Sequence, residues 1–142
     1  MKYFILLLAA VVLVHAKDDF KPRNADDING YRRECHKDFP FNEELQKKEE
    51  TFDYPDEDIV RKYVLCVFKK WDLYDEENGF YNDRITAQVE IFAPREVVER
   101  EVARCVDKNE QGSSTEVYSY RVQQCFLKSP MIPPLLDAMG KL

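Results

Sequence analysis

The sequence predicts an all-α protein, a compact bundle of five to six helices held by two disulfides. Apolar residues recur at three- and four-residue steps, as on one face of a helix, and do not alternate as they do in a strand. Glycine is scarce, with four in 142 residues. The four cysteines are an even number, and the start of the chain directs them to an oxidising compartment, where disulfides form.

The first residues have the three-part layout of a secretory signal peptide. Lys2 precedes an apolar run that ends at Val14, and Val14 and Ala16 stand at positions −3 and −1 of a cleavage site after Ala16. The run is shorter than the about 20 residues that a membrane span needs. We therefore expect a signal peptide at residues 1–16, one secreted domain at residues 17–142 and no membrane anchor.

The composition narrows the range of partners and cofactors. The formal net charge is −6, and nucleic acids and anionic membranes need basic surfaces, so neither is an expected partner. Cys35, Cys66, Cys105 and Cys125 lack the close Cys-x2-Cys spacing that is typical of structural zinc sites. Two disulfides are expected instead, all three pairings stay open, and no metal or cofactor is predicted.

The first two predicted helices differ in strength. Asn24 can cap the first, which places Ile28, Tyr31 and Cys35 on one face. Residues 42–52 are polar and short, and they predict only a marginal helix.

The third helix, residues 57–71, has the widest apolar stripe. Asp56 can cap it, and turn chemistry follows at Asn78-Gly79. The stripe comprises Ile59, Val60, Tyr63, Val64, Val67, Phe68 and Trp71.

Two further helices follow on either side of Pro94, which disfavours helical geometry in the residue before it and suits the first turn of a new helix. The helix over residues 83–92 places Ile85, Val89 and Phe92 on one face. The helix over residues 95–108 carries Val98, Val102, Cys105 and Val106.

The last predicted helix starts at a Ser114 cap. Its stripe comprises Tyr118, Val122, Cys125 and Phe126. An apolar tail follows, and Pro130, Pro133 and Pro134 break it.

This arrangement of core-facing cysteines resembles insect odorant-binding proteins. Six-cysteine members separate their second and third cysteines by three residues and their fifth and sixth by eight, which places the two absent cysteines at Lys62 and Glu116. The chain therefore resembles the four-cysteine Minus-C subgroup. The resemblance implies the pairs Cys35–Cys66 and Cys105–Cys125.

Apolar periodicity alone favours an ordinary solid core. The resemblance implies instead a carrier with an apolar internal cavity. Its expected ligands are odorants, pheromones or fatty-acid-like lipids, carried through an extracellular fluid such as sensillum lymph or haemolymph. The resemblance also implies a chemosensory receptor as a partner. The expected oligomeric state is a monomer or a weak homodimer. The residues expected to touch ligand are Ile28, Tyr31, Val60, Tyr63, Val64, Val67, Phe68, Ile85, Val89, Phe92, Val98, Val102, Tyr118, Val122 and Phe126.

The tyrosines and the tail could each complete such a cavity. Buried tyrosine hydroxyls need a partner, which a ligand's polar group can supply; the candidates are Tyr31, Tyr63, Tyr118 and Tyr120. The apolar tail residues serve either as a lid or wall of the cavity or as plain surface packing, and both readings stay open. They are Met131, Ile132, Leu135, Leu136 and Met139.

Catalysis is not expected. The expected secreted domain has one histidine, His36, which we interpret as an exposed helix residue in preference to a general base or acid-sensing switch. The sequence has no Gly-x-Ser-x-Gly elbow, His-Glu-x-x-His pair or phosphate-binding glycine loop. A secreted helical signalling factor that acts through its surface is the alternative from another class. Insect chemosensory proteins fit less well, since they carry a Cys-x2-Cys pair.

Overall fold

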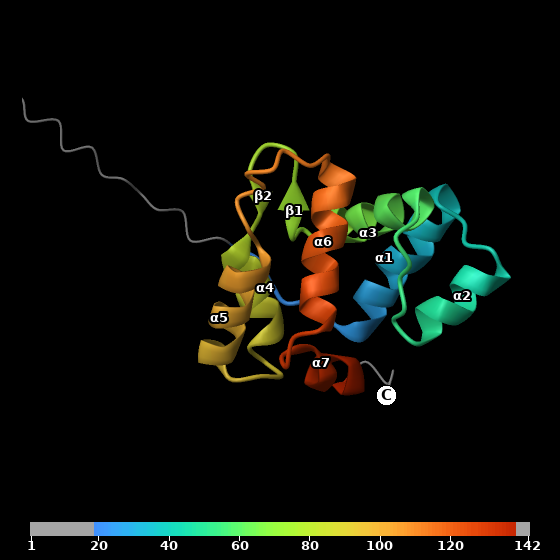
Figure 1. The fold of residues 1–142 in the computed structure, drawn as a ribbon. Helices are drawn as coiled ribbons and strands as arrows, with labels where there is room; N and C mark the ends of the chain where they lie inside the picture. Colours follow the sequence, from blue (N-terminus) through green and yellow to red (C-terminus); the bar gives the residue numbers. More distant parts are fainter. Residues whose placement is uncertain (1–18, 139–142) are drawn as a thin grey trace, which may run out of the picture.

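The computed structural model describes residues 19–138, which form seven helices and one two-stranded hairpin (Figure 1). The all-α prediction is confirmed. The predicted signal peptide and Met139 lie outside the described residues. The elements are α1 Ala25–Asp38, α2 Glu43–Glu50, α3 Asp58–Lys70, β1 Tyr74–Asp75, β2 Gly79–Phe80, α4 Asn82–Val89, α5 Arg95–Cys105, α6 Thr115–Leu127 and α7 Ile132–Ala138.

Asparagine side chains cap the N-termini of the first two helices. Asn24 accepts a hydrogen bond from the Asp27 amide at 2.9 Å, and the Asp27 carboxylate accepts one from the Asn24 amide at 3.2 Å. This reciprocal pair satisfies two amides that have no partner within the helix, and it confirms the predicted cap. Asn42 caps α2 through a single bond, which its side chain accepts from the Leu45 amide at 2.9 Å, and the marginal segment does form a helix.

The predicted caps of α3 and α6 are wrong in detail. Glu57, not Asp56, is the residue before α3, and it makes no side-chain cap bond. Asp56 instead accepts a hydrogen bond from Arg61 at 2.5 Å. Ser114 does precede α6, but its side chain makes no cap bond either. At Asp56 an ion pair with Arg61, five positions further along the chain, therefore takes the place of the cap.

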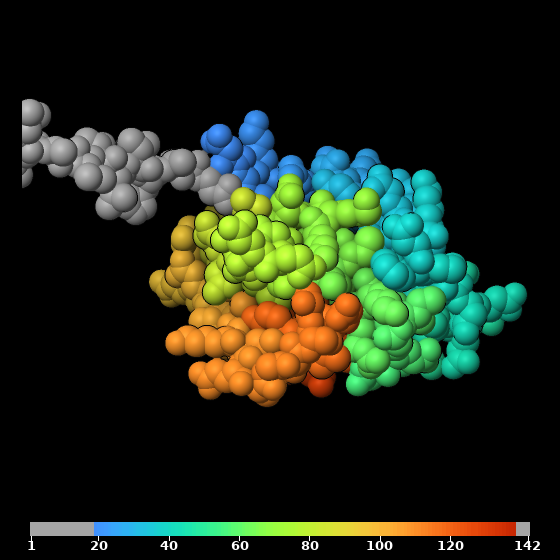
Figure 2. Space-filling model, turned by 90° about the horizontal axis from the view of Figure 1, so that it is seen from above, coloured from blue at the N-terminus to red at the C-terminus, as the bar shows by residue number. Residues whose placement is uncertain are grey.

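The hairpin follows from the turn predicted at Asn78-Gly79. Tyr74 pairs with Phe80 and Asp75 with Gly79. Gly79 has a φ of 73°, which glycine adopts without steric cost, and the Asp75 carboxylate accepts the Asn78 amide at 2.7 Å. Figure 2 shows the hairpin beside the start of α6, where the Phe80 and Tyr118 rings meet with centroids 5.4 Å apart.

Three predictions of helix extent are wrong. The helix predicted over residues 83–92 ends at Val89, so Phe92 lies past its end. The helix predicted over residues 95–108 ends at Cys105. The tail predicted as broken forms α7, because Pro133 and Pro134 occupy its first turn, where backbone amides have no helical partner to lose.

The central helix α3 packs against α1 and α6, and α5 packs against α4 and α6. Disulfides fasten both groups: Cys35–Cys66 joins α1 to α3, and Cys105–Cys125 joins α5 to α6. Their Cα–Cα distances of 5.9 Å and 5.4 Å are ordinary for disulfides. This is the pairing that the resemblance implied.

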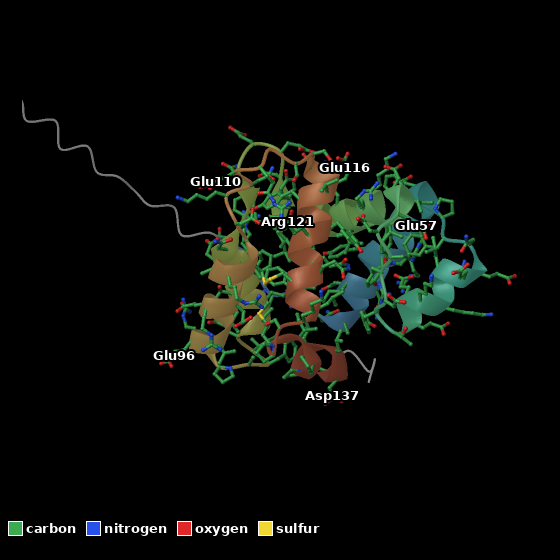
Figure 3. All side chains as sticks on the ribbon, viewed as in Figure 1. Glu57, Glu96, Glu110, Glu116, Arg121 and Asp137 are labelled. Atoms are coloured by element: carbon green, nitrogen blue, oxygen red, sulfur yellow. A yellow bond between two sulfur atoms is a disulfide. The ribbon has the colours of Figure 1, made fainter. Side chains whose placement is uncertain are left out.

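Most of the charged side chains lie on the outside of the bundle. Glu57, Glu96 and Glu110 are exposed, and Glu96 and Glu110 lie near the edge of the molecule in Figure 3. Between residues 19 and 138, no helix is both long and apolar enough to span a membrane.

Candidate functional site

An apolar cavity lies where α1, α3, α4, α6 and α7 meet. It contains about 140 Å³ open to the centres of water molecules, roughly ten times what one water needs. Its lining residues are Ile28, Arg32, Phe52, Tyr54, Tyr63, Val64, Val67, Phe68, Trp71, Leu73, Ile85, Gln88, Val89, Gln123, Phe126, Leu127, Met131, Ile132, Leu135 and Leu136.

Some of the residues that the sequence predicts as ligand contacts line the cavity, and the others do not. Those on its wall are Ile28, Tyr63, Val64, Val67, Phe68, Ile85, Val89 and Phe126. Those away from it are Tyr31, Val60, Phe92, Val98, Val102, Tyr118 and Val122. Contact with a ligand remains a prediction for both sets, but the first set is placed to make it.

The residues away from the cavity have other neighbours. Val60, Val98 and Val122 are fully buried in the solid part of the core. Two of the tyrosine hydroxyls that could bind a ligand bind the backbone instead. Tyr118 donates to the Asp107 carbonyl at 2.5 Å, and Tyr120 donates to the Tyr54 carbonyl at 2.7 Å. These two hydroxyls therefore need no partner from a ligand.

The helix α7 forms part of the cavity wall. Met131 is fully buried and Ile132 and Leu135 are nearly so, and all three line the cavity together with Leu136. Of the two readings of the tail, the structure therefore favours the wall over surface packing. Figure 1 shows α7 beneath α6 and close to the start of α1.

One part of the wall is polar, and its side chains bind Glu49, which lies behind the wall. Glu49 is buried, at 7% exposure. Its Oε1 accepts hydrogen bonds from the Tyr63 hydroxyl at 2.6 Å and from Arg32 at 2.7 Å, and its Oε2 lies 2.8 Å from Nε2 of His36. Arg32 also donates from Nε to the Tyr63 hydroxyl at 3.3 Å. Each of the carboxylate oxygens thus has a partner, as a buried charge requires.

These contacts fix the charge states of the cluster. Burial alone would raise the pKa of Glu49, but hydrogen bonds from Tyr63 and Arg32 outweigh it and lower the pKa below the ordinary 4.5. Burial raises the pKa of Tyr54 and of Tyr63 above the ordinary value of 10.0. Near neutral pH Glu49 is therefore a carboxylate beside the Arg32 guanidinium, and the phenols of Tyr54 and Tyr63 are neutral.

His36 is not the exposed residue that the sequence suggested. Its side chain is 28% exposed, contacts Glu49 and stacks on the Tyr63 ring with centroids 4.4 Å apart. Glu49 is 13 positions away in the chain, so no local pattern reveals the contact.

A second hollow of about 410 Å³ lies behind this cluster. Arg32 and Phe52 border both spaces, whereas His36 and Glu49 border only the second. Its wall holds ionisable groups, so the smaller apolar cavity suits a hydrophobic ligand better.

The segment between α2 and α3 brings two aromatic residues to the cavity. Phe52 has a φ of 56° just after α2, and the Asp53 amide bonds back to the Lys48 carbonyl at 2.9 Å. This is the hydrogen bonding of a helix C-terminus that ends in a residue with left-handed backbone conformation. Glycine usually occupies that position. The carbonyl of Tyr54 is held by Tyr120 of α6. The sequence shows none of this, because glycine normally signals such a turn.

Gln88 closes another part of the wall. It is 1% exposed, and its Oε1 accepts from the Arg23 amide at 2.7 Å and from Trp71 Nε1 at 3.1 Å. Its Nε2 donates to the Arg23 carbonyl at 3.0 Å. The one signal in the sequence is that Gln88 lies among the apolar residues of a predicted helix. Its partners, Arg23 and Trp71, are distant in the chain, so the sequence does not reveal the hydrogen bonds.

The described residues contain no group of three or more histidine, cysteine, aspartate or glutamate side chains placed to hold a metal ion. The structure describes Cys35, Cys66, Cys105 and Cys125 as disulfides.

Comparison with known proteins identifies the class. Residues 17–129 match the model of the PBP/GOBP family, and the chain belongs to this family. It is similar to general odorant-binding protein 99a of Drosophila melanogaster, with 35% identity over 130 residues and 90% of each chain covered. It is also similar to odorant-binding protein 22 of Aedes aegypti, with 30% identity and 91% of each chain covered. General odorant-binding protein 99b of Drosophila melanogaster is 29% identical, with 91% of this chain and 93% of the relative covered. With two disulfides, the chain fits the four-cysteine subgroup.

Proposed function

We propose that this protein binds a small hydrophobic molecule in the apolar cavity and carries it through an extracellular fluid. The observation that supports this most is the cavity itself, with its aliphatic and aromatic lining and a few polar groups at defined places. Binding sites for small molecules have this composition. The names of the relatives describe proteins that bind odorants, which agrees with a carrier and not with an enzyme.

The cavity limits affinity and selectivity. Ten buried methylenes contribute about 0.8 kcal/mol each, and immobilisation of the ligand costs several kcal/mol. The net is therefore weaker than the about −8 kcal/mol of micromolar binding, and polar contacts with the ligand must supply the difference. An apolar wall separates ligands that differ by one methylene by only about 1–3 kcal/mol, so several ligands of similar size should bind.

Native mass spectrometry of the secreted protein, followed by fluorescent probe displacement, tests the proposal. We expect a copurifying hydrophobic molecule, saturable binding of N-phenyl-1-naphthylamine at one site, and displacement by alcohols of about ten carbons. A protein that takes up neither a copurifying molecule nor the probe, but saturably binds a receptor through its surface, would be the signalling factor instead.

A further inference from the structure

We propose that the ligand has an electrically neutral, hydrogen-bonding head, an alcohol or a ketone, and that Arg32 on the cavity wall, paired with Glu49 behind it, discriminates against carboxylates. This inference rests on the proposed function and narrows its ligand class.

The first step is the charge on the wall. Among the described residues that line the apolar cavity, Arg32 is the one ionisable side chain that is charged at neutral pH. All the others are aliphatic, aromatic or amide side chains. On the lining residues alone, an anionic ligand would be the obvious expectation, because a guanidinium binds a carboxylate well.

The second step is that this charge already has its partner. Arg32 donates to Glu49 at 2.7 Å, and both side chains are largely buried, at 17% and 9% exposure. Glu49 does not line the apolar cavity but borders the hollow behind it. The Tyr63 hydroxyl, at 2.6 Å, further stabilises the ionised form of Glu49. Seen from the cavity, the pair is therefore neutral.

The third step compares the two kinds of ligand head. A carboxylate in this cavity would be a third charge, attracted by Arg32 but repelled by Glu49 behind it, after losing its water. An alcohol or ketone needs only a hydrogen bond. Arg32 bonds to Glu49, Tyr63 and Asn29 through one N–H each, and the Tyr54 hydroxyl also interacts with it. A guanidinium has five N–H groups, so at least one remains for a ligand. The neutral Tyr54 hydroxyl lies on the same wall.

The experiment compares 1-decanol, 2-decanone and decanoate in displacement of N-phenyl-1-naphthylamine at pH 8, where the acid is ionised. We expect wild-type protein to bind decanol and decanone at least about tenfold more tightly than decanoate. Glu49→Gln keeps the shape of the side chain but leaves Arg32 without its counter-charge. In this variant the decanoate-to-decanol affinity ratio should rise by about tenfold or more.

Glu101→Gln is the matched control. Glu101 is also buried, at 6% exposure, and also pairs with an arginine, Arg104, at 2.6 Å. It lies on α5 and does not line the cavity, so its replacement should leave the ratio unchanged. Circular dichroism confirms that each variant is folded.

The outcomes separate this inference from the proposed function. Wild-type protein that binds decanoate as tightly as decanol overturns the inference and leaves the carrier function intact. The same holds for an unchanged ratio in folded Glu49→Gln protein. If that variant does not fold, the comparison of ligands on the wild-type protein decides. Failure of all three ligands and of the probe would overturn the carrier function itself.

Discussion

The Tyr63 hydroxyl donates a hydrogen bond of 2.6 Å to Glu49, and Arg32 donates to the same carboxylate oxygen. Since these residues lie on α3, α2 and α1 in that order, one buried carboxylate links three helices. Two of its donors also line the apolar cavity. The cluster therefore stabilises the fold and shapes the candidate site together.

Tyr63→Phe should destabilise the protein because it removes a hydrogen bond to a buried charge. Such bonds contribute about 1.5–3 kcal/mol. Tyr120→Phe is the control, since its hydroxyl donates to the neutral Tyr54 carbonyl, a bond worth about 1 kcal/mol. Urea denaturation monitored by circular dichroism measures both. Equal free energies of unfolding for wild type and Tyr63→Phe would show that the bond contributes nothing.

The lowered pKa of Glu49 predicts a loss of stability in acid. A carboxylate whose pKa is lower in the folded than in the unfolded state stabilises the fold above its unfolded pKa, here about 4.5. That contribution disappears as the pH falls through the lower, folded pKa. The free energy of unfolding should therefore decrease below about pH 4.5.

Glu49→Gln isolates this contribution from those of other acidic residues, because glutamine does not titrate. The difference in unfolding free energy between wild type and the variant should shrink from pH 6 to pH 3. A difference that stays constant over that range would contradict the assignment of an ionised Glu49.

Restoring a third disulfide should stabilise the protein. The resemblance places the two absent cysteines at Lys62 and Glu116, which lie on α3 and α6, two helices that pack together. In the chain-entropy model a bridge between them adds about 4 kcal/mol. The substitution also removes the exposed ion pair between Lys62 and Asp58, and exposed pairs contribute little to stability.

The oxidised Lys62→Cys/Glu116→Cys variant should therefore melt at a higher temperature than the wild type. Mass spectrometry under non-reducing conditions confirms that the new bridge has formed. A bridge that forms but leaves the melting temperature unchanged would contradict this stabilisation.

The contribution of α7 to the cavity wall can be tested with two neighbouring residues. Leu136 lines the cavity, whereas Asp137 is exposed on the same helix. Leu136→Ala removes apolar surface next to the ligand, so decanol affinity should fall by roughly 1–2 kcal/mol, or five- to thirtyfold. Asp137→Ala should have no effect. Equal titration curves for the two variants would mean that α7 does not contact the ligand.

Local sequence patterns predicted most of the fold. The Asn24 cap, the stripe of α3 and the turn at Gly79 depend on residues a few positions apart, where periodicity and capping are informative. The helix α7 was missed because proline breaks a helix only beyond its first turn.

The site was less predictable because its contacts are distant in the chain. Glu49 lies in a polar stretch that resembles a solvated surface, and only the folded chain brings it to Arg32, His36 and Tyr63. Periodicity also places a residue on an inner face without showing whether it meets another side chain or an open space. Val60 and Val64 belong to one stripe, yet only Val64 lines the cavity.

Filling the cavity tests the central claim most directly. Val67 is half-buried and lines the cavity, whereas Val106 is half-buried and lies away from it. Val67→Phe should abolish or strongly weaken binding of N-phenyl-1-naphthylamine, while Val106→Phe should bind it like the wild type, with both variants folded by circular dichroism. Undiminished, saturable binding by Val67→Phe would contradict a ligand site in this cavity.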